Sequence, residues 1–191
     1  IVAGDDLWAD YTLTARFTPE TSKGRSGVSF RHHNDRCYYF CGVQNSKAVL
    51  KLVKHEKAFR VPYEKILAER EFGWKPGEEV SVEISIAGNR IEARINGKTA
   101  LSAEDDTFKH GRISLTSDGP TRFSQVRVTA SEAEKQRVAA AYAKIAGEER
   151  TLQAANPTAK VWKKFRTDGF GVGRNFRFGD PQHRAILRNH Q

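Results

Sequence analysis

The sequence contains no apolar run approaching the roughly 18 residues that a membrane-spanning helix needs, and it has only 2 cysteines. We therefore expect no membrane partner. Cys37 and Cys41 fall in a segment typical of a strand, where a rise of about 3.3 Å per residue puts their Cα atoms about 13 Å apart. That distance exceeds the reach of a disulfide. We expect two free, buried thiols and, because no second cysteine pair exists, no zinc site.

The beginning of the chain lacks a basic region followed by an apolar stretch, which is the pattern of a secretory signal peptide. We therefore predict no signal peptide in this chain. The first residue is an isoleucine, and the chain opens almost directly on an expected strand. Our interpretation is a fragment whose true beginning has been removed.

The net charge of +9 is carried mainly by residues 156–191, which hold eight Lys or Arg and two Asp. Residues 131–155 are balanced, and residues 1–130 hold 20 basic and 17 acidic side chains. A nucleic-acid-binding module combines a folded basic face with stacking aromatic rings, whereas glycines separate the phenylalanines of this tail. We expect no nucleic-acid partner. The irregular basic tail is expected to lie on the rest of the chain, to be disordered, or to self-associate through its phenylalanines.

Up to about residue 130, short segments alternate apolar and polar residues between turn residues. This alternation is that of strands with one buried and one solvated face. Gly88-Asn89 and Asn96-Gly97 predict tight hairpins. With no helical interruption, residues 1–130 are predicted to form an all-β, antiparallel β-sandwich. The expected strands cover residues 11–17, 27–31, 36–43, 48–54, 79–87, 90–95, 98–101, 111–116 and 122–128.

The periodicity changes to that of a helix at Ser131. Ser131 and Glu134 match a capping box, and an apolar stripe that includes Tyr142 follows. We expect a helical linker over residues 131–155, either continuous or broken at Gly147. It would pack one face on the sandwich or separate the sandwich from a following domain.

Three segments together resemble concanavalin A-like jelly-roll domains: SGVSFRHHNDRCYYFCGV, FGWKPGEEVSVEISIAGNRIEARINGK and DDTFKHGRISLTSDGPTRFSQVRV. They are similar to a strand pair, a hairpin and the closing segment of a group that includes laminin-G-like modules and the family labelled 3-keto-disaccharide hydrolase. The resemblance covers about residues 5–130 and implies the jelly-roll fold. Because that group contains binding modules, structural modules and enzymes, the resemblance leaves the function open.

The tail segment VWKKFRTDGFGVGRNFRFGD resembles the entry of the β-propeller in bacterial secreted polysaccharide lyases of the rhamnogalacturonan lyase type. In those proteins FGD leads into an acidic calcium loop, whereas Asp180 is followed here by Pro181. The tail is therefore expected to be a truncated start of a further domain, and lyase chemistry of the propeller is not assigned to this chain. The resemblance implies a secreted or periplasmic location.

Sugars are held by aromatic rings that stack on them and by polar side chains that bind their hydroxyls. By strand parity Tyr38 and Tyr39 face opposite sides, and Arg31 lies opposite the preceding phenylalanine. We therefore predict that Arg31, His33 and one of the two tyrosines share an exposed face as a carbohydrate site, with Trp74 as a further ring. The competing interpretation is that these rings belong to the core, because a sandwich of this size needs buried aromatics.

Paired carboxylates would mark a glycosidase, and Glu83 and Glu92 are the candidate catalytic pair. The residues around them alternate as an exposed polar face, so the competing interpretation is that each is a surface neighbour of Lys or Arg. Four aspartates near strand ends are candidate ligands for a structural calcium ion, although their spacing matches no calcium-loop signature. They are Asp5, Asp6, Asp10 and Asp118.

The leading hypothesis is a carbohydrate-binding or accessory module of a secreted bacterial polysaccharide-degrading protein, with a polysaccharide or oligosaccharide as partner and no cofactor. A second hypothesis is a small glycoside hydrolase or lyase on the same sandwich. A third is a structural or oligomerisation domain without a ligand.

Overall fold

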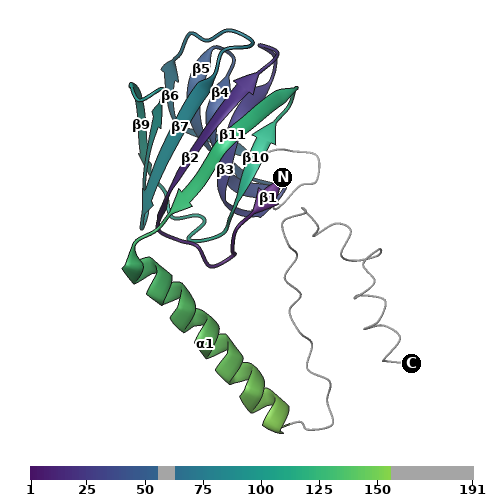
Figure 1. Cartoon of the computed structure of the whole chain (residues 1–191), viewed down its shortest axis with the longest axis vertical. Helices are drawn as coiled ribbons and strands as arrows, with labels where there is room; N and C mark the ends of the chain where they lie inside the picture. Colours follow the sequence, from purple (N-terminus) through teal and green to yellow (C-terminus); the bar gives the residue numbers. More distant parts are fainter. Residues whose placement is uncertain (56–62, 156–191) are drawn as a thin grey trace, which may run out of the picture.

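The structure is a computed structural model that describes residues 1–55 and 63–155. The predicted tail of residues 156–191 lies outside the described residues. Within them, the chain forms eleven strands followed by one helix (Figure 1). In chain order these are β1 (Val2–Ala3), β2 (Tyr11–Pro19), β3 (Arg25–Asn34), β4 (Cys37–Gln44), β5 (Lys47–Lys54), β6 (Glu64–Glu71), β7 (Val80–Ala87), β8 (Arg90–Ile95), β9 (Thr99–Glu104), β10 (Arg112–Ser117), β11 (Thr121–Thr129) and α1 (Glu132–Ala155).

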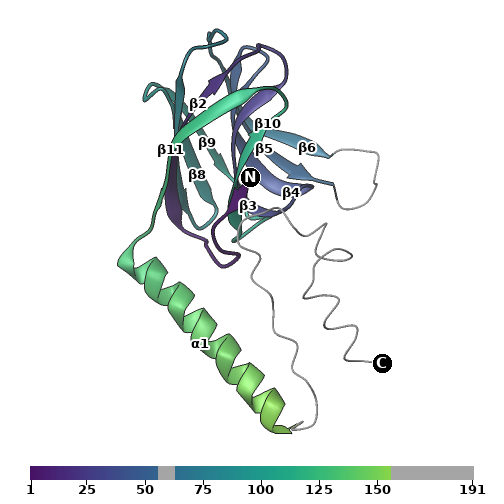
Figure 2. The same cartoon turned by 45° about the vertical axis from the view of Figure 1, so that its right-hand side comes forward.

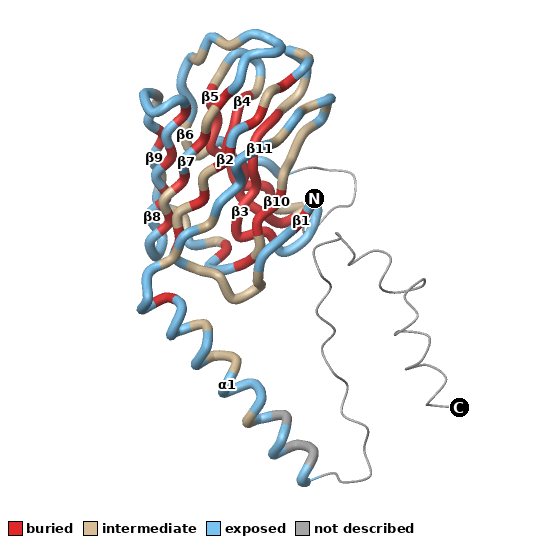
Figure 3. The backbone as a smooth tube through the Cα atoms, in the orientation of Figure 1, coloured by how far each residue is buried: buried red, intermediate tan, exposed pale blue. Residues whose placement is uncertain are grey.

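Two antiparallel sheets pack face to face, as Figures 1 and 2 show from two sides. The six-stranded sheet has the order β1-β10-β3-β4-β5-β6, and the five-stranded sheet has the order β11-β2-β7-β8-β9. Alternate residues of the strands β2–β11 enter one apolar core between the sheets. Figure 3 shows the buried residues within the strands and α1 mostly exposed. The all-β sandwich and the C-terminal helix expected from the sequence are confirmed.

All nine expected strands are present, and the sequence pattern missed β1 and β6. The strand β1 is only two residues long. The strand β6 lies at the edge of its sheet and is mostly charged, a composition that protects sheet edges but hides the apolar alternation. The two cysteines are free and buried as expected, and burial raises the pKa of the Cys41 thiol to about 12.

The alternation of β3 breaks at Arg31, whose φ angle is 44°. Pairing with β4 shifts register between Phe30 and Asn34, so a bulge interrupts the strand here. The bulge turns Arg31 into the protein, where it is 1% exposed. The prediction that Arg31 lies on an exposed face is therefore wrong, because strand parity does not continue through a bulge.

The buried guanidinium of Arg31 connects three segments at one end of the sandwich. It donates hydrogen bonds to the carbonyl oxygens of Ala9 at 3.1 Å, Gly88 at 2.7 Å and Phe108 at 2.9 Å. These residues lie before β2, in the β7–β8 turn and before β10, respectively. Arg31 thus reaches from the six-stranded sheet to a turn of the five-stranded sheet.

The helix α1 is fixed at its start by Glu134, which is 6% exposed. One of its oxygens, Oε1, accepts hydrogen bonds from the backbone N–H groups of Ala9 at 2.9 Å and Asp10 at 3.3 Å. Its other oxygen binds Arg137 Nε at 2.6 Å. Two turns further along, the Tyr142 hydroxyl bonds an Asp5 carboxylate oxygen at 2.5 Å. The helix therefore binds the segment that precedes β2.

The predicted capping box is half right. The Ser131 hydroxyl accepts the Glu134 N–H at 3.1 Å, but the Glu134 carboxylate turns to the segment before β2. The helix is continuous through Gly147 and extends away from the sheets (Figure 1). Among the described residues, no helix combines the length and the apolar character that a membrane span requires.

Removing the Arg31 guanidinium should strongly destabilise the sandwich. In Arg31→Met, buried carbonyl oxygens lose their donors, and we expect a loss of about 3 kcal/mol in the free energy of unfolding, measured by urea denaturation. Arg16→Met is the control, because the Arg16–Glu79 pair is half exposed and should contribute under about 1 kcal/mol. Equal stabilities of the two variants would contradict the role assigned to Arg31.

The attachment of α1 to the sandwich should weaken at acid pH. The hydrogen bond from Arg137, with those from Ala9 and Asp10, lowers the pKa of Glu134 from 4.5 to about 2. Because the folded pKa lies below the unfolded value, the stabilisation is present above pH 4.5 and is lost as the pH falls towards 2. In Glu134→Gln this part of the pH dependence should disappear, as urea unfolding between those two pH values would show. If the stability of Glu134→Gln depended on pH as that of the wild type does, the role assigned to Glu134 would be refuted.

Candidate functional site

The residues predicted to form a carbohydrate site do not lie together. Arg31 is buried between the sheets, and Tyr39 lies in the core with its hydroxyl bonded to an Asp105 oxygen at 2.5 Å. His33 is exposed, and Trp74 is half-buried and packs against the core. Tyr38 lies in a separate buried cluster on the opposite face of the six-stranded sheet. The predicted opposition of Tyr38 and Tyr39 is confirmed, but the predicted shared exposed face does not exist.

The outer face of the six-stranded sheet, on the side away from the core, carries a second layer of buried side chains. Phe40 and Val53 are 0% exposed there, and Tyr38 is 5% exposed. Of the described elements, α1 could cover a sheet face, but it extends away from both sheets (Figure 2). Within the described residues, the cations of Arg25 and Lys51 lie over the Tyr38 and Phe40 rings. This outer face includes Arg25, Tyr38, Phe40, Gln44, Lys47, Val49, Lys51, Val53, Glu64, Ile66 and Glu69.

Lys51 is the most unusual residue of this face, because its charged side chain is 2% exposed. Its Nζ donates to Gln44 Oε1 at 3.0 Å and to Glu64 Oε2 at 2.7 Å, and lies 5.4 Å from the centroid of the Phe40 ring. Burying an ammonium group costs several kcal/mol that pairing only partly offsets. An apolar side chain of similar size would fill the same volume more cheaply, so packing alone does not explain a lysine here.

Arg25 extends the ionic network over aromatic rings. Its guanidinium carbon lies 5.8 Å from the Tyr38 ring centroid and 5.6 Å from that of Phe40. Its Nε bonds Asp118 at 3.2 Å, and its NH1 lies 3.9 Å from Glu64 Oε1. Burial raises the pKa of the Tyr38 hydroxyl. Cations, carboxylates and rings therefore form one connected surface.

A pair of glycines keeps the strands beneath this surface close together. Gly27 and Gly42 face each other across β3 and β4. A Cβ atom on Gly42 would lie 2.2 Å from the Ser26 carbonyl oxygen and 2.7 Å from the Gly27 Cα. Only glycine therefore fits this register.

Around Lys51 the outer face of the six-stranded sheet forms a depression of about 300 Å³, which we call the outer depression. The 48%-exposed Ile66 gives it an apolar surface, the 3%-exposed Val49 lies beneath, and amides, ammonium groups and carboxylates surround that surface. Apolar lining with a few fixed polar groups is typical of ligand sites. The lining residues are Gln44, Asn45, Lys47, Val49, Lys51, Glu64, Ile66 and Glu69.

Sequence reasoning missed the outer depression because its polar residues come from three strands, including the unpredicted β6. A usable signal existed in β5, where Val49 and Val53 lie on the same face as Lys47 and Lys51. Two valines on the face expected to be solvated indicate that this face is partly buried.

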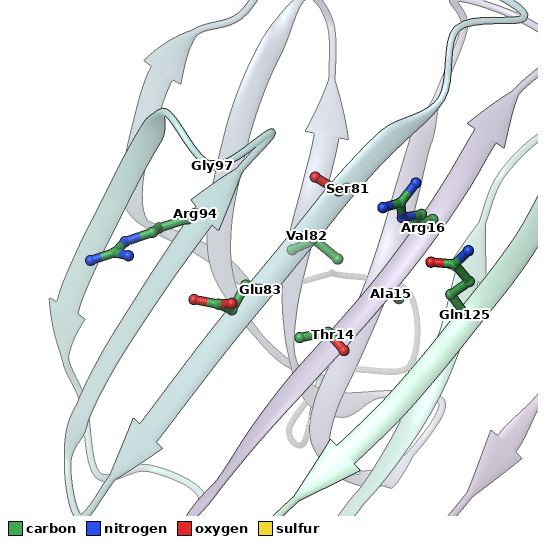
Figure 4. Close-up of a pocket in the computed structure, with 9 residues that line it drawn as sticks. All are labelled: Thr14, Ala15, Arg16, Ser81, Val82, Glu83, Arg94, Gly97 and Gln125. Atoms are coloured by element: carbon green, nitrogen blue, oxygen red, sulfur yellow. The ribbon is translucent and has the colours of Figure 1, made fainter.

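The five-stranded sheet has a depression of about 340 Å³ on its own outer face (Figure 4). Its lining includes Thr14, Ser81, Glu83 and Arg94, and no aromatic ring. Glu83 pairs in register with Arg94, and both are exposed. This face is thus an ordinary solvated sheet surface.

The candidate catalytic carboxylates are both on this solvated face. Glu83 lies across from Arg94, and Glu92 is bonded by Arg90. Each carboxylate is therefore a surface neighbour of an arginine. This arrangement agrees with the competing interpretation of the sequence and not with a catalytic pair.

The four aspartates proposed as calcium ligands each bind protein groups. Among the described residues, no three His, Cys, Asp or Glu side chains come together as a metal site. The partners are Tyr142 for Asp5, Arg112 for Asp6, the Gly88 N–H for Asp10 and Arg25 for Asp118.

The comparisons with known proteins bear on the fold. No protein-family model matches the sequence, and no curated protein matches it. The carbohydrate-binding module CBM66 from Bacillus subtilis aligns with a TM-score of 0.57 at 16% identity, over 64% of this chain and 76% of that one. Chicken galectin 2 aligns with a TM-score of 0.49 at 9% identity, over 64% and 92% of the two chains. The first alignment supports a jelly-roll sandwich for this chain.

The contact between Gly27 and Gly42 should tolerate no side chain. In Gly42→Ala the strands β3 and β4 must separate, and we expect a loss of at least about 2 kcal/mol in the free energy of unfolding. Gly73→Ala is the matched control, since nothing lies within 4 Å of its added Cβ, and its stability should change by less than about 1 kcal/mol. Thermal or urea denaturation of both variants measures this. A Gly42→Ala protein as stable as Gly73→Ala would contradict the close packing.

Proposed function

We propose that this chain binds carbohydrate at the outer depression of the six-stranded sheet. A sugar presents C–H faces and many hydroxyl groups, so its site needs apolar surface and fixed hydrogen-bonding groups together. The outer depression offers Ile66 as apolar surface, with Gln44 and Glu64 as polar groups that the buried Lys51 holds in place. Polar side chains held by one another before binding lose little conformational entropy when a ligand arrives.

The observation that carries the proposal is the buried Lys51 with its partners. Its Nζ is held at 2.7 Å from Glu64, and Glu64 itself is partly exposed to the depression. An ion pair that is costly for stability and faces a hollow is better explained by ligand binding than by packing.

The fold supports the same proposal more generally. The module from Bacillus subtilis with the similar sandwich is described as carbohydrate-binding. The wider role, an accessory module of a secreted bacterial polysaccharide-degrading protein, is a proposal that rests on the sequence resemblance to concanavalin A-like domains and secreted lyases.

The test is Lys51→Met against a panel of plant and bacterial glycans, measured by affinity electrophoresis and titration calorimetry. We expect the wild-type chain to bind at least one glycan without releasing sugars. Lys51→Met should weaken binding at least tenfold, because the ammonium group holds Gln44 and Glu64, the polar groups that would meet the ligand, in fixed positions. Because Lys51→Met leaves Glu64 without the ammonium group bonded to it, its free energy of unfolding is expected to fall, and binding is compared under conditions where both proteins are folded.

The matched control is Arg94→Met, which removes a cation from the solvated face of the other sheet and should leave binding intact. The proposal fails if no glycan binds, or if Lys51→Met binds as the wild type does. Release of reducing ends or unsaturated products would indicate the enzyme hypothesis instead.

A further inference from the structure

We infer that the outer depression selects a neutral oligosaccharide, bound through the protons of its hydroxyl groups, and excludes acidic sugars. This inference rests on the proposed carbohydrate binding at the same depression and names the class of sugar.

The charges that line the depression already neutralise one another. Lys51 Nζ lies 2.7 Å from Glu64 Oε2, and Lys47 Nζ lies 2.7 Å from Glu69 Oε1. These are the four charged side chains among its lining residues. Among the described lining residues, a ligand carboxylate would therefore meet no uncompensated cation, and it would add a third negative charge beside two carboxylates.

The ammonium group of Lys51 has little donor capacity to spare. It carries three protons. Two of its hydrogen bonds go to Gln44 and Glu64, and the nitrogen lies over the Phe40 ring. With two of its three protons used and its side chain 2% exposed, this group has at most one hydrogen bond to offer an acceptor such as a carboxylate.

The spare capacity lies on the carboxylates, which accept hydrogen bonds. Glu64 uses Oε2 for Lys51, while its Oε1 has Arg25 NH1 at 3.9 Å, beyond hydrogen-bond distance. Glu69 uses Oε1 for Lys47. Each carboxylate has about four lone-pair positions, so both can accept further O–H donors. Sugar hydroxyls are such donors.

The spacing of the two carboxylates indicates the length of the ligand. Glu64 and Glu69 lie across from Val53 and Val49 of β5, which are about 13 Å apart at the rise of a strand. Ile66 projects between them, opposite Lys51, and offers apolar surface to a sugar ring. A ligand that meets both carboxylates and this side chain is an oligosaccharide rather than a single sugar.

The experiment compares matched tetramers that differ in the C6 group. The pairs are mannotetraose with tetramannuronate, cellotetraose with tetraglucuronate, and galactotetraose with tetragalacturonate, titrated into the full chain. We expect the neutral member of a bound pair to bind at least tenfold more tightly than the acidic one. Neutral binding should change less than about twofold between low and high salt, because no net charge is exchanged.

The variants Glu64→Gln and Glu69→Gln each replace a carboxylate by a neutral amide. Glu64→Gln removes the carboxylate bonded to Lys51, and Glu69→Gln leaves Lys47 with Glu71 at 3.9 Å. Each should weaken neutral binding and shift the acidic-to-neutral affinity ratio towards the acidic tetramer by about tenfold or more. Glu83→Gln, on the solvated face of the other sheet, is the matched control and should leave the ratio unchanged. If one of the two variants folds poorly, the affinity ratio of the other still tests the inference.

The outcomes separate this inference from the proposed function. Acidic tetramers that bind as tightly as neutral ones, and lose binding in Lys51→Met, would overturn the inference and support the proposed function. Chitotetraose with free amino groups binding more tightly than every neutral tetramer would also overturn it. Binding of no tetramer or polysaccharide would refute the proposed function itself.

Discussion

At one end of the sandwich, the guanidinium of Arg31 joins three connections that are far apart in the sequence. A buried cation needs hydrogen-bond partners and a counter-charge to offset its lost hydration, and an Asp10 carboxylate oxygen lies 3.6 Å from Arg31 NH2. The three carbonyls that it binds are therefore held in one arrangement. One of them belongs to Ala9, whose N–H binds Glu134 of the helix. The position of the helix thus depends on the same segment that the sandwich orders through Arg31.

The two faces of the six-stranded sheet differ in what they bury. The inner face contributes apolar residues to the core, while the outer face buries a lysine and aromatic rings and carries a half-buried arginine over those rings. The five-stranded sheet has a solvated outer face of the ordinary kind. This asymmetry, rather than any single residue, distinguishes one face of the molecule as the candidate site.

The fold was largely predictable from the sequence, because alternation and turn residues depend on local chemistry. The site was not. Arg31 and His33 were placed by strand parity, and a bulge at Arg31 ended that parity. The bond between Lys51 and Glu64 joins β5 to a strand without a clear apolar alternation. Contacts between strands depend on register, and register follows from the whole sandwich rather than from neighbouring residues.

The contacts at the start of α1 fix the orientation of the whole helix relative to the sheets. Its 24 residues span about 36 Å, and its first turns are bound to the segment before β2 by a carboxylate, an arginine and a tyrosine. A helix held in this way behaves as a rigid arm rather than as a hinge. The far end of α1 therefore keeps a fixed position relative to the two sheets. A ligand held by the sandwich would then keep one orientation relative to the far end of the helix.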